Sequence, residues 1–576
     1  MNKIFALLAT TILIYSCGSD KKEFENAGGS LKIALDSAPS TLIATDITDV
    51  YSQTVVSQVT EGLVSFNPDD LTLQPQLAEK WKMSQDGKTF TFTLRKDVYF
   101  HEHEVFGSDD DRLLVPEDVL ATVEFSCKKN DKGEARPTYL ALWKDQLLGA
   151  NEFFSGKAKS IKGLKIKGND IEFTLTESDP TFAEKLAQVN AGIVAKEIID
   201  AKKEHELNGT GPFKFAESTN NEQERIVLTK NEDYYLIDEK GNALPYLDSV
   251  IFIVETRKLE QLDLFENKQI DVIRGLPISR ISEMLDGHID EFNAVPPTMV
   301  LYNNPLLNTQ FYFFNLSDKR FQDPRVRMAF NYAVDKNQIA ENALNNQYYE
   351  MGRYGIVPPI SSNFNGYDFK KVGENGYNFD PEKAKALLAE AGFPNGEGFG
   401  SVNLRIDIKD INSAVAEEFA NQIKMHLNIN VNIDGSDFQA KNDDANYAKG
   451  DLFRSSWTAD YNSPETFLSN FYGKFVPKSI DLPSNINQSR YVNPAFDALY
   501  EKARAAQSQK ERYKTFVEAE VELLKNPPFI PLWYSNNFQL VYSNVRNLKL
   551  NPMDLINLTR VYKKDWTKEE YLKAKK

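Results

Sequence analysis

The chain has 576 residues, of which 41% are hydrophobic and 26% charged, and its formal net charge is -16 at pH 7. This ordinary globular composition excludes an intrinsically disordered chain, and the length exceeds what one compact core holds, so we expect two or more lobes. The acidic balance argues against a surface that binds phosphate groups uniformly, and nucleic acid is therefore not expected as a partner.

An export signal opens the chain. Lys3 precedes an apolar run over 4–15, which is too short to span a bilayer because a spanning helix needs roughly 20 residues. We therefore interpret residues 1–16 as a signal peptide. Cys17 at the cleavage point resembles the cysteine of a bacterial lipobox and is the candidate lipidation site, with plain secretion or an uncleaved anchor as the alternatives. Residues 17–29 are polar and are predicted to form a flexible, lipid-anchored tether.

The chain has one further cysteine, Cys127. Since Cys17 has a separate role, we expect Cys127 to be unpaired and buried as a small hydrophobic residue. No second hydrophobic span follows, so the rest of the chain is expected to work in water beside a membrane.

Strand patterns dominate the first half of the mature chain. A strand is predicted over 31–35 and a helix over 46–62, where apolar residues recur along one face. Residues 90–95 alternate between apolar and polar, as in a half-buried strand, and 164–175 has the pattern of a hairpin. A breaker cluster and two further strand patterns follow, at 208–212, 226–228 and 249–254.

The second half is more helical. Asp323-Pro324 and Asp380-Pro381 each place an N-cap and a first-turn proline before a periodic apolar stretch, so a helix is predicted after each pair. A long helical region is predicted over 494–524, followed by strands over 529–533 and 538–542. This mixture favours α/β lobes over a helical bundle or a β-sandwich.

Catalytic and metal motifs are mostly absent from the sequence. It has no His-Glu-x-x-His motif, no Gly-x-Ser-x-Gly elbow and no phosphate-binding loop, so neither an enzyme nor a cofactor is indicated. His101 and His103 would share one face of a strand and could contact one metal ion. Because the acidic residues 109–111 follow closely, the simpler interpretation is a solvated surface loop that holds no metal.

The most informative segment is 451–473. Residues 451–457 are predicted to form a strand and 458–462 a loop, and Ser463 can cap a helix whose first turn contains Pro464. Loops that lead from a strand into a helix are where α/β folds place ligand-binding groups.

Four side chains of this segment suit a zwitterionic ligand. Asp460 can neutralise an ammonium group, and Arg454 can hold a carboxylate through two hydrogen bonds, while Trp457 and Tyr461 can line the walls. The alternative is structural. Asp460 would then complement the positive end of the following helix, and Trp457 would be core. Arg454 would pair with Asp451 on the surface.

Motifs along nearly the whole mature chain resemble those of one family. The stretch from Trp457 to Pro464 looks like the Trp-x-x-Asp-Tyr-x-x-Pro motif of the bacterial family 5 solute-binding proteins, the oligopeptide- and dipeptide-binding group. Glu102-His103 stands where the family usually has Asp-Gly, so the role of the His101–His103 loop stays open. Further elements in the family's order are Thr60 to Leu63, Gln76 to Trp81, Ser84 to Phe90, Gly209 to Phe213, Asp323 to Arg327 and Asp380 to Ala384.

The resemblance implies a two-lobed α/β periplasmic-binding-protein fold with an extra inserted domain. It also implies that Asp460 holds the amine of a short peptide and that Arg454, three residues before Trp457, meets its carboxylate. Tyr461 belongs to the same motif. Members for other ligands vary these residues, so a metal chelate or a sugar is the alternative cargo.

The three domains follow from the same resemblance. Domain I is expected to be discontinuous, domain II to be inserted into it, and domain III to be the lobe that closes on the ligand. The expected segments are domain I at 30–63, 207–297 and 529–565, domain II at 64–206, domain III at 298–528, and a charged C-terminal tail at 566–576.

We therefore predict a monomeric, extracytoplasmic lipoprotein on the periplasmic or extracellular side of a membrane, which delivers peptides to the membrane permease of an ABC transporter. Closure of the lobes would remove water from the pair between Asp460 and the ligand's ammonium and so strengthen it. A cell-surface hydrolase and a structural surface lipoprotein without transport are the rivals from other classes.

Overall fold

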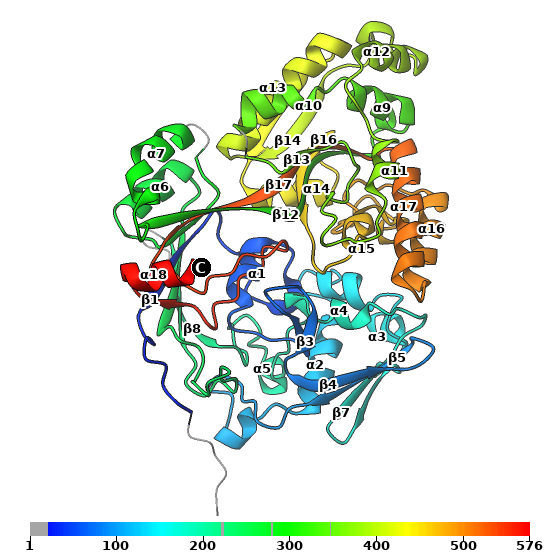
Figure 1. The fold of residues 1–576 in the computed structure, drawn as a ribbon. Helices are drawn as coiled ribbons and strands as arrows, with labels where there is room; N and C mark the ends of the chain where they lie inside the picture. Colours follow the sequence, from blue (N-terminus) through cyan, green and yellow to red (C-terminus); the bar gives the residue numbers. More distant parts are fainter. Residues whose placement is uncertain (1–20, 220–223, 278–279, 346, 576) are drawn as a thin grey trace, which may run out of the picture.

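The computed structural model describes residues 21–219, 224–277, 280–345 and 347–575. The predicted signal peptide and Cys17 lie outside the described residues. The described chain forms two lobes of mixed helices and strands, joined by a pair of long strands (Figure 1). The predicted two-lobed α/β fold is confirmed. No helix in the described ranges is both long enough and apolar enough to cross a bilayer.

One large sheet runs through both lobes. In the described residues its strand order is β15-β14-β16-β12-β17-β11-β1-β10-β9-β8. The long strands β12 (Met299–Phe314) and β17 (Phe529–Tyr542) pair antiparallel along their length and cross from one lobe to the other. At the first-lobe end, β17 pairs with β11 (Val272–Arg274), and at the second-lobe end β12 pairs with β16 (Leu452–Thr458).

The first lobe contains the remaining half of this sheet and a second sheet. β1 (Ser30–Leu35) lies between β11 and β10 (Ser249–Val254), parallel to both, as suits its largely buried side chains. The second sheet packs with α2 (Pro116–Ser126) around a core drawn from residues 63–198. The other elements of this lobe include β9 (Arg225–Lys230), β8 (Phe213–Thr219), α1 (Val50–Val56), β4 (Ala78–Met83), β5 (Thr89–Leu94), β6 (Leu164–Lys167), β7 (Asp170–Thr174), α4 (Phe182–Lys185) and α6 (Lys258–Glu266).

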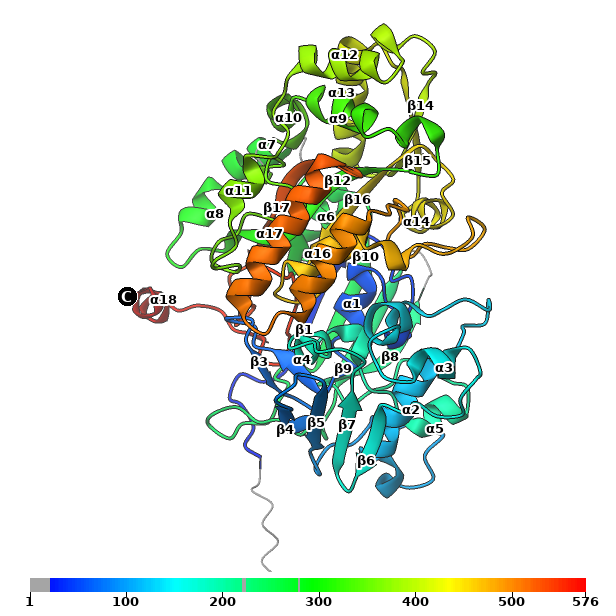
Figure 2. The same cartoon turned by 90° about the vertical axis from the view of Figure 1, so that its right-hand side faces the viewer.

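Three parallel strands form the centre of the second lobe. β14 (Val402–Asp407) lies between β15 (Val431–Ser436) and β16. α13 (Asp410–Leu427) and α14 (Phe438–Asn446) connect them, so the carboxyl ends of all three strands lie at one edge of the sheet. The other helices of this lobe include α9 (Pro324–Tyr332), α10 (Lys336–Ile339), α11 (Phe369–Gly373), α12 (Pro381–Glu390), α15 (Glu465–Leu468), α16 (Pro494–Ala505) and α17 (Gln509–Lys525), the last two packed side by side (Figure 2).

Two helix starts were predicted from capping aspartates, and the structure confirms both the helices and the caps. The Asp323 carboxylate accepts the backbone N–H of Arg325 at the start of α9, and the Asp380 carboxylate accepts that of Lys383 at the start of α12. Each satisfies a donor that the first helical turn would leave without a partner. The strand over 31–35 and the hairpin over 164–175 are confirmed as well.

Three predicted elements have different bounds. The helix expected over 46–62 is only α1, because the Asp49 carboxylate caps it by accepting the N–H groups of Tyr51 and Ser52. The region over 494–524 is two helices, since Ser508 caps α17 and ends the continuity. The two strands expected over 529–542 are the single strand β17.

The two ends of the described chain differ: the N-terminal end packs against the first lobe, whereas the C-terminal helix has no buried residue. Within the predicted flexible tether, Lys22 N–H donates to the Gly241 carbonyl, and the Phe24 ring stacks 4.2 Å from that of Tyr246. The expectation of a flexible stretch is therefore wrong for residues 21–29. The charged tail forms α18 (Lys568–Ala574), whose cap residue is Thr567.

Cys127 is fully buried and free, as predicted. The expected domain boundaries near 298 and 529 fall at the first residues of β12 and β17, which run through both lobes. The division into three domains stays a prediction.

Candidate functional site

A cavity of about 1320 Å³ lies between the two lobes. The first lobe contributes wall residues such as Asp36, Thr48 and Tyr51. All four ligand-binding residues predicted from the sequence line the second-lobe side: Arg454, Trp457, Asp460 and Tyr461.

The topology explains why charged side chains gather on the second-lobe wall. Because β14, β15 and β16 are parallel, the segments that follow them meet at one edge of the sheet. These segments carry Lys409, Lys441 and Asp460 respectively, and all three line the cavity. The predicted strand-to-helix loop after β16 is thus part of a larger cluster of strand-end segments.

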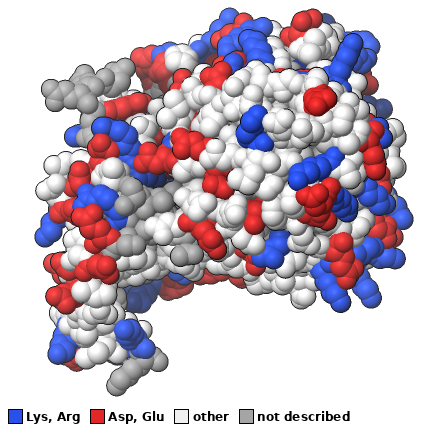
Figure 3. Space-filling model, turned by 90° about the horizontal axis from the view of Figure 1, so that it is seen from above, with Lys and Arg blue, Asp and Glu red and all other residues white. Residues whose placement is uncertain are grey.

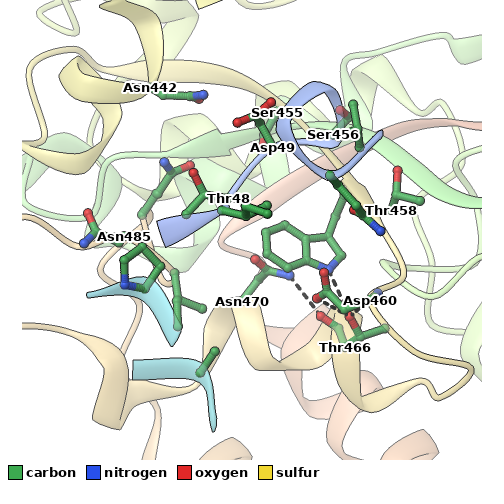
Figure 4. A pocket seen from close by; sticks show the side chains of 18 of the residues that line it. Thr48, Asp49, Asn442, Ser455, Ser456, Thr458, Asp460, Thr466, Asn470 and Asn485 are labelled. Carbon is green, nitrogen blue, oxygen red and sulfur yellow. Dashed lines mark hydrogen bonds between the residues drawn. The ribbon is translucent and has the colours of Figure 1, made fainter. Parts of the chain in front are cut away.

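Asp460 is half-buried, and no cation of the described residues forms an ion pair with it. The Thr466 hydroxyl donates to Asp460 Oδ2 at 2.9 Å (Figure 4). The backbone N–H of Asp460 donates to the hydroxyl oxygen of Thr466 at 3.2 Å. Burial raises the pKa of Asp460 to about 6, although the hydrogen bond from Thr466 acts in the opposite direction. The carboxylate is therefore available to a cation from outside the chain.

Asp460 accepts no hydrogen bond from the first backbone N–H groups of the following helix, whose partners are elsewhere. The N–H of Glu465, at the start of α15, donates to the Ser463 hydroxyl at 3.2 Å. The N–H of Thr466 donates to the Ser463 carbonyl. The helix begins one residue later than predicted, with Pro464 and not Ser463 at the cap position, although the Ser463 hydroxyl still accepts the N–H of Glu465. Asp460 forms its hydrogen bonds to that helix with the Thr466 hydroxyl.

The two aromatic residues differ in how far they enter the cavity wall. Trp457 is half-buried, packs against the core of the second lobe, and donates Nε1–H to the Thr466 hydroxyl oxygen at 3.2 Å. Tyr461 is 5% exposed and belongs to the same core, with Lys185 Nζ 5.7 Å from its ring centroid. Trp457 therefore both lines the cavity wall and packs in the core, the two roles considered for it from the sequence. Tyr461 is mainly a packing residue.

Arg454 already has partners inside the chain. Its Nη1 is 3.1 Å from Asp407 Oδ1, and its Nη2 donates to Gln310 Oε1 at 2.6 Å. The surface pair with Asp451 considered from the sequence is wrong, because Asp451 pairs with Arg320 at 2.9 Å. A ligand carboxylate near Arg454 would therefore join an existing hydrogen-bonded group.

Three buried charges and the half-buried Arg504 connect the lobes beside the cavity. Lys185 of the first lobe contacts Glu465 of the second at 2.6 Å, and Arg504 of the second contacts Asp179 of the first at 3.4 Å. Burial would raise the pKa of Asp179, but Lys185 and Arg504 hold it well below its usual range. No sequence pattern predicts this group, because Lys185 and Glu465 are 280 positions apart along the chain.

Two further hydrogen bonds join the lobes. Lys409 Nζ donates to the Tyr51 hydroxyl at 2.6 Å, and the Tyr447 hydroxyl donates to Glu134 Oε1 at 2.7 Å. Each pair joins one residue of the first lobe to one of the second. The structure is therefore a closed conformation.

The two histidine rings of the 101–103 loop have separate partners. His101 is 3% exposed, with Nε2 2.9 Å from the Gly211 carbonyl oxygen, whereas His103 Nε2 lies 2.8 Å from Glu206 Oε2. The two rings thus have different partners, and the solvated-loop interpretation is wrong for His101. The described residues contain no cluster of His, Cys, Asp and Glu that could hold a metal ion.

Charges of both signs are mixed on the molecular surface seen in Figure 3. Lysine and arginine side chains are interspersed there with aspartate and glutamate. That face has no broad area of one sign, which agrees with the argument from composition against a uniform phosphate-binding surface.

Comparison with known proteins places these features in context. The family model described as "Bacterial extracellular solute-binding proteins, family 5 Middle" matches residues 72–478. Heme-binding protein A of Haemophilus influenzae is 28% identical over 513 residues, covering 86% of this chain and 85% of that protein. The periplasmic oligopeptide-binding protein OppA of Escherichia coli is 26% identical over 478 residues, covering 81% and 80% respectively.

A solved structure agrees with these sequence relatives. It is the ABC transporter-associated periplasmic binding protein DppA from Helicobacter pylori in complex with the peptide STSA. The likeness has a TM-score of 0.79 at 25% identity and covers 94% of this chain and 99% of that one.

Proposed function

Since the chain belongs to the family 5 bacterial extracellular solute-binding proteins, which serve transport and are not enzymes, we propose that it captures short peptides between its lobes. The observation that carries this proposal is Asp460, a half-buried carboxylate in the interlobe cavity that lacks a cationic partner. A peptide's terminal ammonium is a small cation that would supply that partner.

The proposed mechanism uses both ends of the peptide. The ammonium group pairs with Asp460, and the terminal carboxylate joins the hydrogen-bonded group of Arg454 and Gln310. The peptide backbone lies extended between the lobes, so that main-chain hydrogen bonds supply much of the affinity. Closure excludes water and strengthens the ammonium–carboxylate attraction, so the ligand selects the closed form.

The relatives support a peptide as the cargo. The Escherichia coli relative is an oligopeptide-binding protein, and the Helicobacter pylori structure contains a bound peptide. A cavity of about 1320 Å³ exceeds the 300–1,000 Å³ typical of small-molecule pockets, and it has room for several residues of a peptide.

A metal chelate is the second candidate, because the Haemophilus influenzae relative is a heme-binding protein. The unpaired carboxylate of Asp460 favours the peptide over a heme, since a heme has no ammonium group for it to bind.

We further propose that Cys17 carries a lipid anchor, that the protein works as a monomer on the outer side of a membrane, and that it delivers its cargo to an ABC-transporter permease. The apolar run before Cys17 and the named transport roles of the relatives support these steps.

Native mass spectrometry of the protein purified from its own host tests the cargo directly. We expect bound masses that fragment into short peptides, and calorimetry with those peptides should give saturable, one-to-one binding. A heme or a sugar as the bound species, with no heat from any peptide, would overturn the peptide assignment. Incubation with the same peptides should leave them uncleaved.

A further inference from the structure

Lys441 is a buried cation in the cavity wall. It lies on α14, is 3% exposed and lines the cavity. Its Nζ donates to the side-chain oxygen of Asn442 at 2.6 Å and lies 5.2 Å from the ring centroid of Phe438. Within the part of the chain that the structure describes, no carboxylate forms an ion pair with it.

Three charged groups act on Lys441 electrostatically: the carboxylate of Asp407 and the two cations Arg454 and Lys409. Arg454 is matched by Asp407 at 3.1 Å, and Lys258 by Asp36 at 2.5 Å. Lys409 lies further from Asp36, at 3.9 Å, and gives its hydrogen bond to a neutral tyrosine. The charges that influence one another along this wall include more cations than carboxylates: Lys258, Arg274, Lys409, Lys441 and Arg454 against Asp36, Asp407 and Asp554.

We propose that Lys441, together with Lys409 of the same cavity wall, forms a subsite for a second carboxylate of the ligand, and that the preferred ligands are therefore peptides with an Asp or Glu side chain. The proposal rests on the proposed function and adds a substrate class to it. Asp460 would bind the ammonium end, and the Lys441 subsite would bind the acidic side chain.

The energetics of burial support this assignment. A buried charge without a counter-charge is costly, because it has lost water and gained no partner. Burial lowers the pKa of Lys441 to about 8, although Asp407 acts in the opposite direction. The side chain therefore stays mostly charged at neutral pH. An acidic side chain of the ligand would supply the missing partner, whereas a neutral one would leave Lys441 uncompensated.

The test compares peptides that differ only in one charge. Calorimetry at pH 7 uses Glu-Ala-Ala, Ala-Glu-Ala and Ala-Ala-Glu, each against its glutamine counterpart. A charge-assisted hydrogen bond contributes about 1.5–3 kcal/mol, so at least one glutamate peptide should bind about 10- to 150-fold more tightly than its counterpart. Lys441→Met should remove this preference and leave the affinity for the glutamine peptide within about threefold.

The matched control is Lys510→Met. Lys510 is exposed on α17 and does not line the cavity, so the variant makes the same change in net charge and should keep the preference. If peptides bind but no glutamate peptide binds more tightly than its counterpart, the subsite is wrong and the proposed function stands. If none of the six peptides binds the wild-type protein, the proposed function fails and the subsite with it. The wild-type comparison decides the matter even if Lys441→Met does not fold.

Discussion

Opposing influences set the pKa of Asp460. Burial disfavours its charged form, and the single hydrogen bond from Thr466 favours that form only in part. The resulting pKa of about 6 means that the carboxylate is mostly ionised at neutral pH, yet it can be neutralised by mild acid. A ligand ammonium binds the ionised form alone, so proton and ligand compete for this side chain.

This competition predicts how binding depends on pH. Affinity for an amine-bearing peptide should be greatest near neutral pH and should fall as the pH drops through about 6, approaching tenfold per pH unit. It should also fall in alkali, because the peptide's own α-ammonium loses its proton at a pKa of about 7.7–8.0. Calorimetry between pH 5 and 7 measures the fall in acid, because the peptide's own termini keep their charges in that range. Asp460→Asn should flatten the profile. A wild-type affinity independent of pH over this range would contradict the assignment.

At the scale of single elements, local chemistry made much of the fold predictable. Asp323 and Asp380 cap helices through their own carboxylates, so a few consecutive residues contain the whole signal. The same holds for β16 and the loop that carries Asp460, where a strand followed by a loop and a helix start predicts a ligand-binding position. The partners of Arg454 could not be predicted from local sequence, since Asp407 and Gln310 come from neighbouring strands.

The ion pairs between the lobes could not be predicted from the sequence for a related reason. Lys185 and Glu465 are 280 positions apart, and no periodicity or spacing relates them. Lys441 was missed because a lysine on a short, polar helix has the sequence pattern of a surface residue. Only the tertiary arrangement of β14, β15 and β16 brings it to the cavity.

Thr466 connects α15 to the site and gives a prediction at this scale. Its hydroxyl donates to Asp460 and accepts from Trp457, so it positions both side chains. Thr466→Val should weaken binding of an amine-bearing peptide by about fivefold, the value of one neutral hydrogen bond near 1 kcal/mol. It should also raise the pKa of Asp460, which moves the fall in affinity to higher pH.

The control for that variant is Thr515→Val. Thr515 is a buried threonine of α17 whose hydroxyl donates to a helix carbonyl, and it does not line the cavity. Its loss should leave both the affinity and its pH profile unchanged. If Thr466→Val leaves the pH profile where it was, Thr466 does not set the pKa of Asp460.

For the whole molecule, the buried charges between the lobes favour closure. Glu465 contacts Lys185 of the opposite lobe and Arg504 of its own, and Asp179 completes the group. Removing one member of a buried charge group leaves the others uncompensated, which costs about 3–5 kcal/mol. In an open form the remaining charges are solvated by water, so the substitution destabilises the closed form more than the open form.

Glu465→Gln should therefore shift the ligand-free protein toward an open form. Small-angle X-ray scattering should give a larger radius of gyration for the variant than for the wild type, and added peptide should reduce the difference. The matched control is Glu518→Gln, which exchanges a half-buried glutamate on α17 that does not line the cavity. Identical scattering from Glu465→Gln and wild type would mean that these ion pairs do not govern closure.

The most direct test asks whether Asp460 receives the ligand's ammonium. Calorimetry compares Ala-Ala-Ala with its N-acetylated form on wild type, on Asp460→Asn, and on Asp380→Asn, a helix cap outside the cavity. The account predicts that acetylation weakens wild-type and Asp380→Asn binding by about 100-fold or more, and Asp460→Asn binding by less than about threefold. Equal affinity of the wild-type protein for the free and the acetylated peptide would contradict it.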